Sequence, residues 1–211
     1  RKGTPRVAGV LLLEPTEVGA LDQIVTTGAA EAVIAGLGPD DQVAVTDNQQ
    51  GFIIPMQHVT DHKAIDAQLE KATLGDGPYL KYFKLAGDAL AKTDAPLKHI
   101  VVLGDGDELH NDQAAYQDLI QGYRVQGITT SAVGLNTHSD AGFMANMQDF
   151  ARWGGGRFYD ADSTEQVPQL FLTETQVALR ACYAQSPSFP RDPSPRHLLP
   201  GVPLAACPPL A

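Results

Sequence analysis

The stretch HIVVLGDGDE, His99–Glu108, decides the fold class. It is apolar from Ile100 to Leu103, and glycine and acidic residues follow at once. A short unbroken apolar run of this kind is typical of a strand buried on both faces of a parallel sheet. We predict two further buried strands at Val7–Leu13 (VAGVLLL) and Thr129–Gly134 (TTSAVG).

Segments with apolar residues at helical spacing alternate with these strands. We expect helices over Leu21–Leu37, His62–Ala72, Tyr79–Lys92, Asp112–Val125, Ala141–Trp153 and Thr164–Tyr183. The remaining strands are expected at Gln42–Val45, Gly51–Met56 and Arg157–Ala161, the first two paired around a DNQQ turn. This alternation predicts an α/β fold. We expect a Rossmann-like, doubly wound and mostly parallel sheet, with one antiparallel edge strand and helices on both faces.

Composition narrows the function. The 211 residues include 25 acidic and 15 basic side chains, for a net charge of −10. Nucleic acids and anionic membranes reward dense Lys and Arg, so we expect neither as a partner. The sequence also has no apolar run near the ~20 residues of a membrane span, so we expect no membrane insertion by this chain.

Prolines indicate one domain boundary. Eight of the 15 prolines fall between Pro187 and Pro209, a density that excludes helix interiors and central strands. We therefore expect one domain at 1–185 and a Pro-rich tail at 186–211, the stub of a C-terminal region. The cysteines Cys182 and Cys207 are too few for a disulfide-dense scaffold or a four-cysteine zinc site, and whether they pair is left open.

Acidic residues follow two of the predicted strands. Glu14, Thr16 and Glu17 come after the first, and Asp105 and Asp107 come after the strand at His99. Ligands of open α/β sheets bind beyond the carboxyl ends of the strands, so these loops form the candidate rim if the two strands are neighbours. Carboxylates crowded there would favour protonation or a hard cation. Alternatively, they are solvated residues that cap the following helices.

The order of these segments resembles a von Willebrand factor type A (vWA) domain over about residues 6–183. The resemblance rests on Val7–Val18, GPDDQVAV at Gly38–Val45, HIVVLGDG at His99–Gly106 and GITTSAVGLN at Gly127–Asn136. The later FARWGGGRFYDADSTEQVPQLFLTET, Phe150–Thr175, is similar to the end of bacterial envelope members that carry a glutamine-amidotransferase-like region. The resemblance implies a protein-binding domain of an envelope protein.

The resemblance also implies a metal-ion-dependent adhesion site with an Asp-x-Ser-x-Ser loop. Here Glu14 stands at the aspartate and Thr16 at the first serine, whereas Val18 replaces the second serine and removes an oxygen ligand. The longer side chain of Glu14 displaces its carboxylate by about one C–C bond relative to aspartate.

Two further positions depart from the family pattern. Pro78 stands at the threonine of the glycine-rich loop, and Gly104 stands where a threonine is usual, while Asp105 keeps the second aspartate. Mg²⁺ requires near-ideal octahedral oxygen ligands. We therefore expect a degenerate site, with no cofactor or with weakly bound Mg²⁺ or Ca²⁺ at Glu14, Thr16 and Asp105.

Substitute ligands are available in the same loops. Glu17, Asp107 or Glu108 could replace the lost oxygens, and Ca²⁺ would tolerate the irregular geometry better than Mg²⁺. Tyr79 is expected to be exposed at the rim, whereas Phe83 and Trp153 are expected in the core.

Three functions remain open. The first is a non-catalytic module that binds a protein partner or a neighbouring domain at the rim. The second is a hydrolase or metal-dependent enzyme that uses Glu14, Asp105 and His110, although the sequence contains no Gly-x-Ser-x-Gly or Cys–His arrangement and no Walker motif. The third is a structural domain packed against the rest of its parent chain. His58 and His62 are interpreted as surface residues rather than zinc ligands, and WGGGRF as a tight turn into the last strand.

Overall fold

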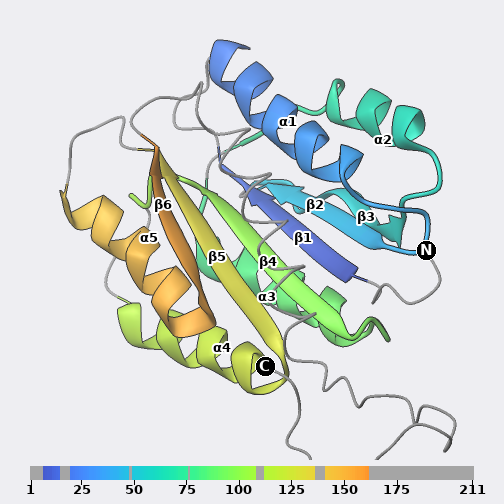
Figure 1. The fold of residues 1–211 in the computed structure, drawn as a ribbon. Helices are drawn as coiled ribbons and strands as arrows, with labels where there is room; N and C mark the ends of the chain where they lie inside the picture. The colour runs from blue at the N-terminus through green and yellow to red at the C-terminus, as the bar shows by residue number, and fades with distance from the viewer. Residues whose placement is uncertain are drawn as a thin grey trace, which may run out of the picture.

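A six-stranded sheet forms the centre of the domain (Figure 1). The computed structural model describes residues 7–14, 20–47, 49–75, 77–107, 112–135 and 141–161. In spatial order the strands are β3 (Phe52–His58), β2 (Gln42–Asp47), β1 (Val7–Leu13), β4 (Leu97–Gly104), β5 (Ile128–Leu135) and β6 (Gly155–Ala161). All neighbours pair in parallel except β3, which runs antiparallel to β2 at one edge. The predicted fold class is confirmed.

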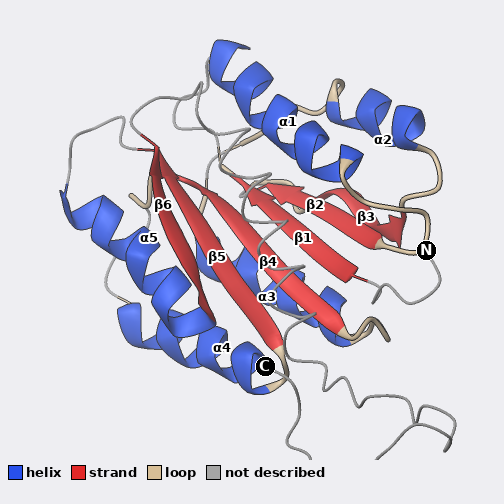
Figure 2. Cartoon of the chain, in the orientation of Figure 1, coloured by secondary structure: helices blue, strands red, loops and turns tan. Residues whose placement is uncertain are grey.

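Helices cover both faces of the sheet, as Figures 1 and 2 show. On one face lie α1 (Ala20–Ala35) and α2 (His62–Leu69). On the other lie α3 (Tyr79–Ala91), α4 (Gln113–Val125) and α5 (Ala141–Gly154). Each face buries its own core because successive strand residues point to opposite sides. Val10 and Leu12 of β1 pack toward α3–α5, whereas Leu11 and Leu13 pack toward α1 and α2.

Local chemistry sets the ends of the elements. The Asp61 carboxylate accepts a hydrogen bond of 3.1 Å from the backbone N–H of Ala64 and so caps the start of α2. Asp112 occupies the equivalent position of α4, where its backbone carbonyl, rather than its side chain, accepts hydrogen bonds from the first turn of the helix. Gly155 adopts φ +71°, a left-handed conformation that suits glycine, and opens β6 as the predicted turn.

Aromatic side chains fill the core beneath α3, α4 and α5. Phe83 and Trp153 are buried there, as predicted. The Phe150 ring lies 4.9 Å from Phe83 and 5.5 Å from Tyr116, measured between ring centroids. These ring contacts pack α3, α4 and α5 against one another on this face of the sheet.

Several predictions fall outside the described residues. They include the closing helix at Thr164–Tyr183, the tail at 186–211 with the domain boundary before it, and both cysteines. Among the described helices, none has both the length and the apolar character needed to span a bilayer.

Candidate functional site

The carboxyl ends of β1 and β4 lie side by side in the middle of the sheet. Leu13 pairs with Leu103, and the next backbone N–H, that of Glu14, donates to the Leu103 carbonyl at 2.9 Å. From β1 the chain builds the sheet outward on one side through β2 and β3, and on the other through β4, β5 and β6. This reversal of strand order is where open α/β sheets bind ligands.

Three carboxylates converge at this point. Glu14, Asp105 and Asp107 each offer one oxygen, and these oxygens all lie within 4.8 Å of one another. Glu14 is 1 % exposed and Asp105 3 % exposed, whereas Asp107 is half-buried. Asp107, expected at the rim but as a metal ligand only in substitution, is therefore part of the cluster.

The loop after β4 is held in place by α5. Gly106 adopts φ +81°, and a Cβ there would collide with the backbone carbonyl of Phe143. The Asn146 amide donates to the Gly106 carbonyl at 2.8 Å, and the Asp107 N–H donates to Asp105 Oδ1 at 3.2 Å. Asp105 and Asp107 therefore lie in a hydrogen-bonded turn whose middle residue, Gly106, has no room for a side chain.

Tyr79 is fully buried, so its expected exposure at the rim is wrong. As the first residue of α3, it lies on the sheet, and its ring packs 5.5 Å from Phe150 and 6.5 Å from Phe83. Its hydroxyl nevertheless lies beside the Glu14 carboxylate. A Cβ built on Gly104 would fall within 3.0 Å of both Tyr79 Oη and Glu14 Oε2, so these two oxygens crowd the same small space.

A buried carboxylate that the sequence analysis missed organises the adjacent loops. Asp47, at the end of β2, is fully buried and accepts backbone hydrogen bonds from Gln50 (2.7 Å), Gly51 (3.0 Å) and Gly75 (3.1 Å). It thereby ties the β2–β3 turn to the glycine-rich loop that precedes Pro78. An Asp followed by polar residues and glycine, as in DNQQG, is the signal that could have revealed it.

The donor set fits a hard divalent cation. Mg²⁺ and Ca²⁺ are bound through oxygen, and carboxylates are their commonest charged ligands. Three carboxylates at this separation repel one another, and a cation between them relieves that repulsion. The set differs from the expected one, because Asp107 joins Glu14 and Asp105. Thr16, Glu17, Glu108 and His110 lie outside the described residues.

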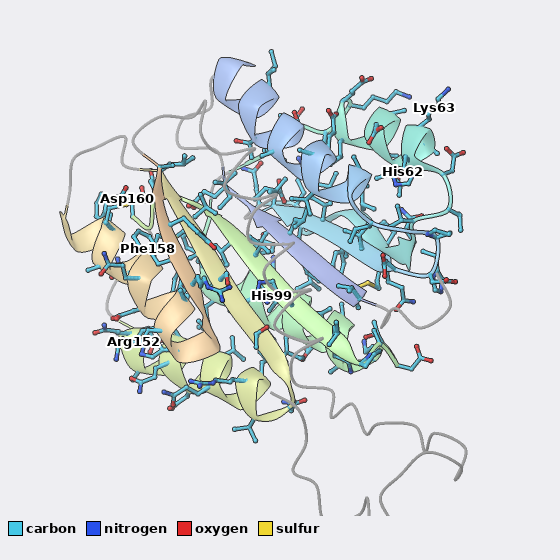
Figure 3. The ribbon with its side chains drawn as sticks, viewed as in Figure 1. His62, Lys63, His99, Arg152, Phe158 and Asp160 are labelled. Carbon is cyan, nitrogen blue, oxygen red and sulfur yellow. The ribbon has the colours of Figure 1, made fainter. Side chains whose placement is uncertain are left out.

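The histidines of the described residues lie away from the rim. His58 and His62 are at the opposite edge, where His58 Nε2 lies 3.4 Å from the Gln42 amide nitrogen and His62 Nε2 lies 3.3 Å from the Leu37 carbonyl oxygen. Their separate partners agree with the expectation of surface residues. His99, near the middle of the sheet in Figure 3, lies on β4 with Nδ1 2.6 Å from Thr129 Oγ1.

Comparison with known proteins identifies the fold. No family model and no curated protein matches the sequence. Among solved structures, a von Willebrand factor type A protein from Catenulispora acidiphila superposes with a TM-score of 0.70 at 13 % identity, covering 83 % of this chain and 43 % of its own.

Two other solved structures share this fold. An aerotolerance-related membrane protein from Bacteroides fragilis has a TM-score of 0.62 at 14 % identity, covering 82 % of this chain and 99 % of its own. Proximal thread matrix protein 1 from the mussel byssus, with a zinc-occupied MIDAS motif, has a TM-score of 0.66 at 13 % identity, covering 83 % and 46 %. The chain therefore has the fold of a vWA domain, as its sequence resemblance implied.

Proposed function

We propose that this chain is a non-catalytic, protein-binding domain of a larger bacterial envelope protein. Its binding surface is the rim formed by Glu14, Asp105 and Asp107. The convergence of these three carboxylates at the switch point of the sheet carries the proposal. Burying the carboxylates of Glu14 and Asp105 costs folding free energy. Such a cost is typical of a binding site rather than of a solvated surface.

The adhesion site of this domain is altered. In the family that the chain resembles, an acidic residue of the partner completes the metal shell. Here Asp107 brings a third carboxylate from the chain itself. A cation held by Glu14, Asp105 and Asp107 would leave the rim with a net negative charge, so an acidic partner group gains little there. We propose weak cation binding, with Ca²⁺ favoured over Mg²⁺ because Ca²⁺ accepts irregular geometry.

A binding role is also favoured by the chemistry of the rim. Hydrolysis needs an activated nucleophile or a positioned acid–base pair. Among the described residues, the groups placed at the cluster are the carboxylates of Glu14, Asp105 and Asp107, with the buried Tyr79 hydroxyl beside Glu14. An envelope location is supported by the similarity of the fold to that of the aerotolerance-related membrane protein.

Photo-crosslinking in the native host tests the proposal. A photoreactive amino acid would be placed in the parent protein at Pro78, which is exposed beside the rim. The control position is Val125, 89 % exposed at the end of α4. We expect a discrete adduct from position 78 only, which disappears in Asp105→Ala and persists in Asp118→Ala, an exposed acid on α4. Equal adducts from both positions, or an adduct at 78 indifferent to Asp105→Ala, would refute the rim as the binding surface.

A further inference from the structure

We infer that the Tyr79 hydroxyl is the fourth oxygen donor of the rim site and coordinates a hard divalent cation together with Glu14, Asp105 and Asp107. The inference rests on the proposed function only in placing a cation at this rim. Tyr79 is on α3, whereas the three carboxylates lie in the loops that follow β1 and β4.

The first argument is the state of the hydroxyl. Tyr79 is 0 % exposed, and no described residue offers its Oη a hydrogen-bond partner. Buried tyrosine hydroxyls usually have a partner, because leaving one unsatisfied costs free energy. Tyr116, Tyr82 and Tyr123 of the same core follow that rule, as each hydroxyl is within 3.1 Å of a polar backbone atom. A cation coordinated by the Tyr79 oxygen would account for this exception.

The second argument is where the hydroxyl lies. Its oxygen and Glu14 Oε2 crowd the space beside the Gly104 Cα, so a side chain larger than hydrogen at position 104 has no room. Gly104 does not have a positive φ, so close approach rather than backbone conformation favours glycine there. The Tyr79 ring is held by its edge-on contact with Phe150, and its hydroxyl lies beside Glu14 Oε2, one of the three carboxylates of the cluster.

The third argument is charge. The three carboxylates carry enough negative charge to attract a divalent cation, and a fourth would add repulsion. A phenol adds an oxygen ligand without adding charge. Pro78, immediately before Tyr79, has no side-chain oxygen to offer, and it turns the chain into α3 with φ −65°. Ca²⁺ takes six to eight oxygen ligands, so a neutral fourth donor raises its affinity.

Calorimetric titration with CaCl₂ tests the inference on three proteins: the wild type, Tyr79→Phe and Tyr116→Phe. Phenylalanine keeps the ring packing and removes only the oxygen. We expect Tyr79→Phe to raise the Kd for Ca²⁺ about tenfold, the scale of losses around metal sites, whereas Tyr116→Phe stays within about twofold. Thermal melts with and without CaCl₂ show that each variant is folded.

Terbium luminescence gives a second, independent readout. In a Trp153→Phe background, Tb³⁺ bound in place of Ca²⁺ is sensitised by a tyrosine that touches it. We expect Tyr79→Phe to abolish most of this emission and Tyr116→Phe to preserve it. If Tyr79→Phe binds Ca²⁺ as tightly as the wild type and keeps full Tb³⁺ emission, the inference about Tyr79 is wrong, whereas cation binding at the three carboxylates is still supported. A wild type that binds no cation also overturns it, and the crosslinking experiment then decides the proposed function separately.

Discussion

Replacing Gly104 by alanine tests the close packing at the rim. The added Cβ would fall within 3.0 Å of both Tyr79 Oη and Glu14 Oε2, and 3.1 Å from Glu14 Cβ. Neither side chain can retreat freely, because Tyr79 packs on Phe150 and Glu14 is buried. Overpacking of this kind typically costs about 1–3 kcal/mol, and we place Gly104→Ala at about 3 kcal/mol because two fixed groups must move.

Urea unfolding of purified protein measures this cost, and Gly9→Ala provides the matched control. Gly9 is also in a central strand, but a Cβ there would meet nothing closer than the His99 carbonyl oxygen at 4.0 Å. We expect Gly9→Ala to change the free energy of unfolding by less than about 1 kcal/mol.

A double-mutant cycle identifies the partner of the clash. In a Tyr79→Phe background the hydroxyl is gone, so Gly104→Ala should cost about 1 kcal/mol less than in the wild type, a coupling typical of contacting residues. A Gly104→Ala variant as stable as the wild type would show that the two oxygens do not crowd this position. Strict additivity of the two changes would show that the Tyr79 hydroxyl is not the obstacle.

Three further outcomes concern the Tyr79 hydroxyl, the buried Asp47 carboxylate and the Asp88 carboxyl. Without cation, Tyr79→Phe should stabilise the domain by about 1 kcal/mol in urea unfolding, because it removes a buried unsatisfied hydroxyl. Tyr116→Phe should destabilise the domain by a similar amount, because it removes the hydroxyl that accepts a hydrogen bond from the Leu80 N–H. Asp47→Asn should cost about 2–3 kcal/mol by the same assay, since its carboxylate holds several backbone N–H groups. The Tyr123 hydroxyl and the Lys84 ammonium lower the pKa of the Asp88 carboxyl. Asp88 therefore stabilises the domain above its unfolded pKa of about 4, and the stability difference between wild type and Asp88→Asn should shrink as acid titration passes below that pH.

The sequence predicted the strands and the edge where the site lies. Unbroken apolar runs such as Val7–Leu13 form strands whatever surrounds them, because both faces must be buried. Acidic residues directly after two such strands had to meet at one edge once the strands were neighbours. Element bounds were predicted less well: β4 starts at Leu97 rather than His99, because pairing with β1 extends it.

The parts of the site that escaped prediction depend on tertiary contacts. Tyr79 follows a glycine-rich loop, a setting typical of surface residues. Only the packing of α3 against the Phe150 ring turns it inward. The sequence around Asp47 indicates only a turn, because the hydrogen bond from Gly75, 28 residues further on, depends on the tertiary fold. Asp107 was one of several equivalent acids, and the turn at Gly106 selects it.

The most direct test of the account is the affinity of the crosslinked partner, once purified, for the isolated chain and its rim variants. We expect Asp107→Ala to raise the Kd at least about tenfold, as expected for a residue at the centre of an interface, and Asp118→Ala to leave it unchanged. An equal Kd for the wild type and both variants would contradict the claim that the partner binds at the rim of Glu14, Asp105 and Asp107.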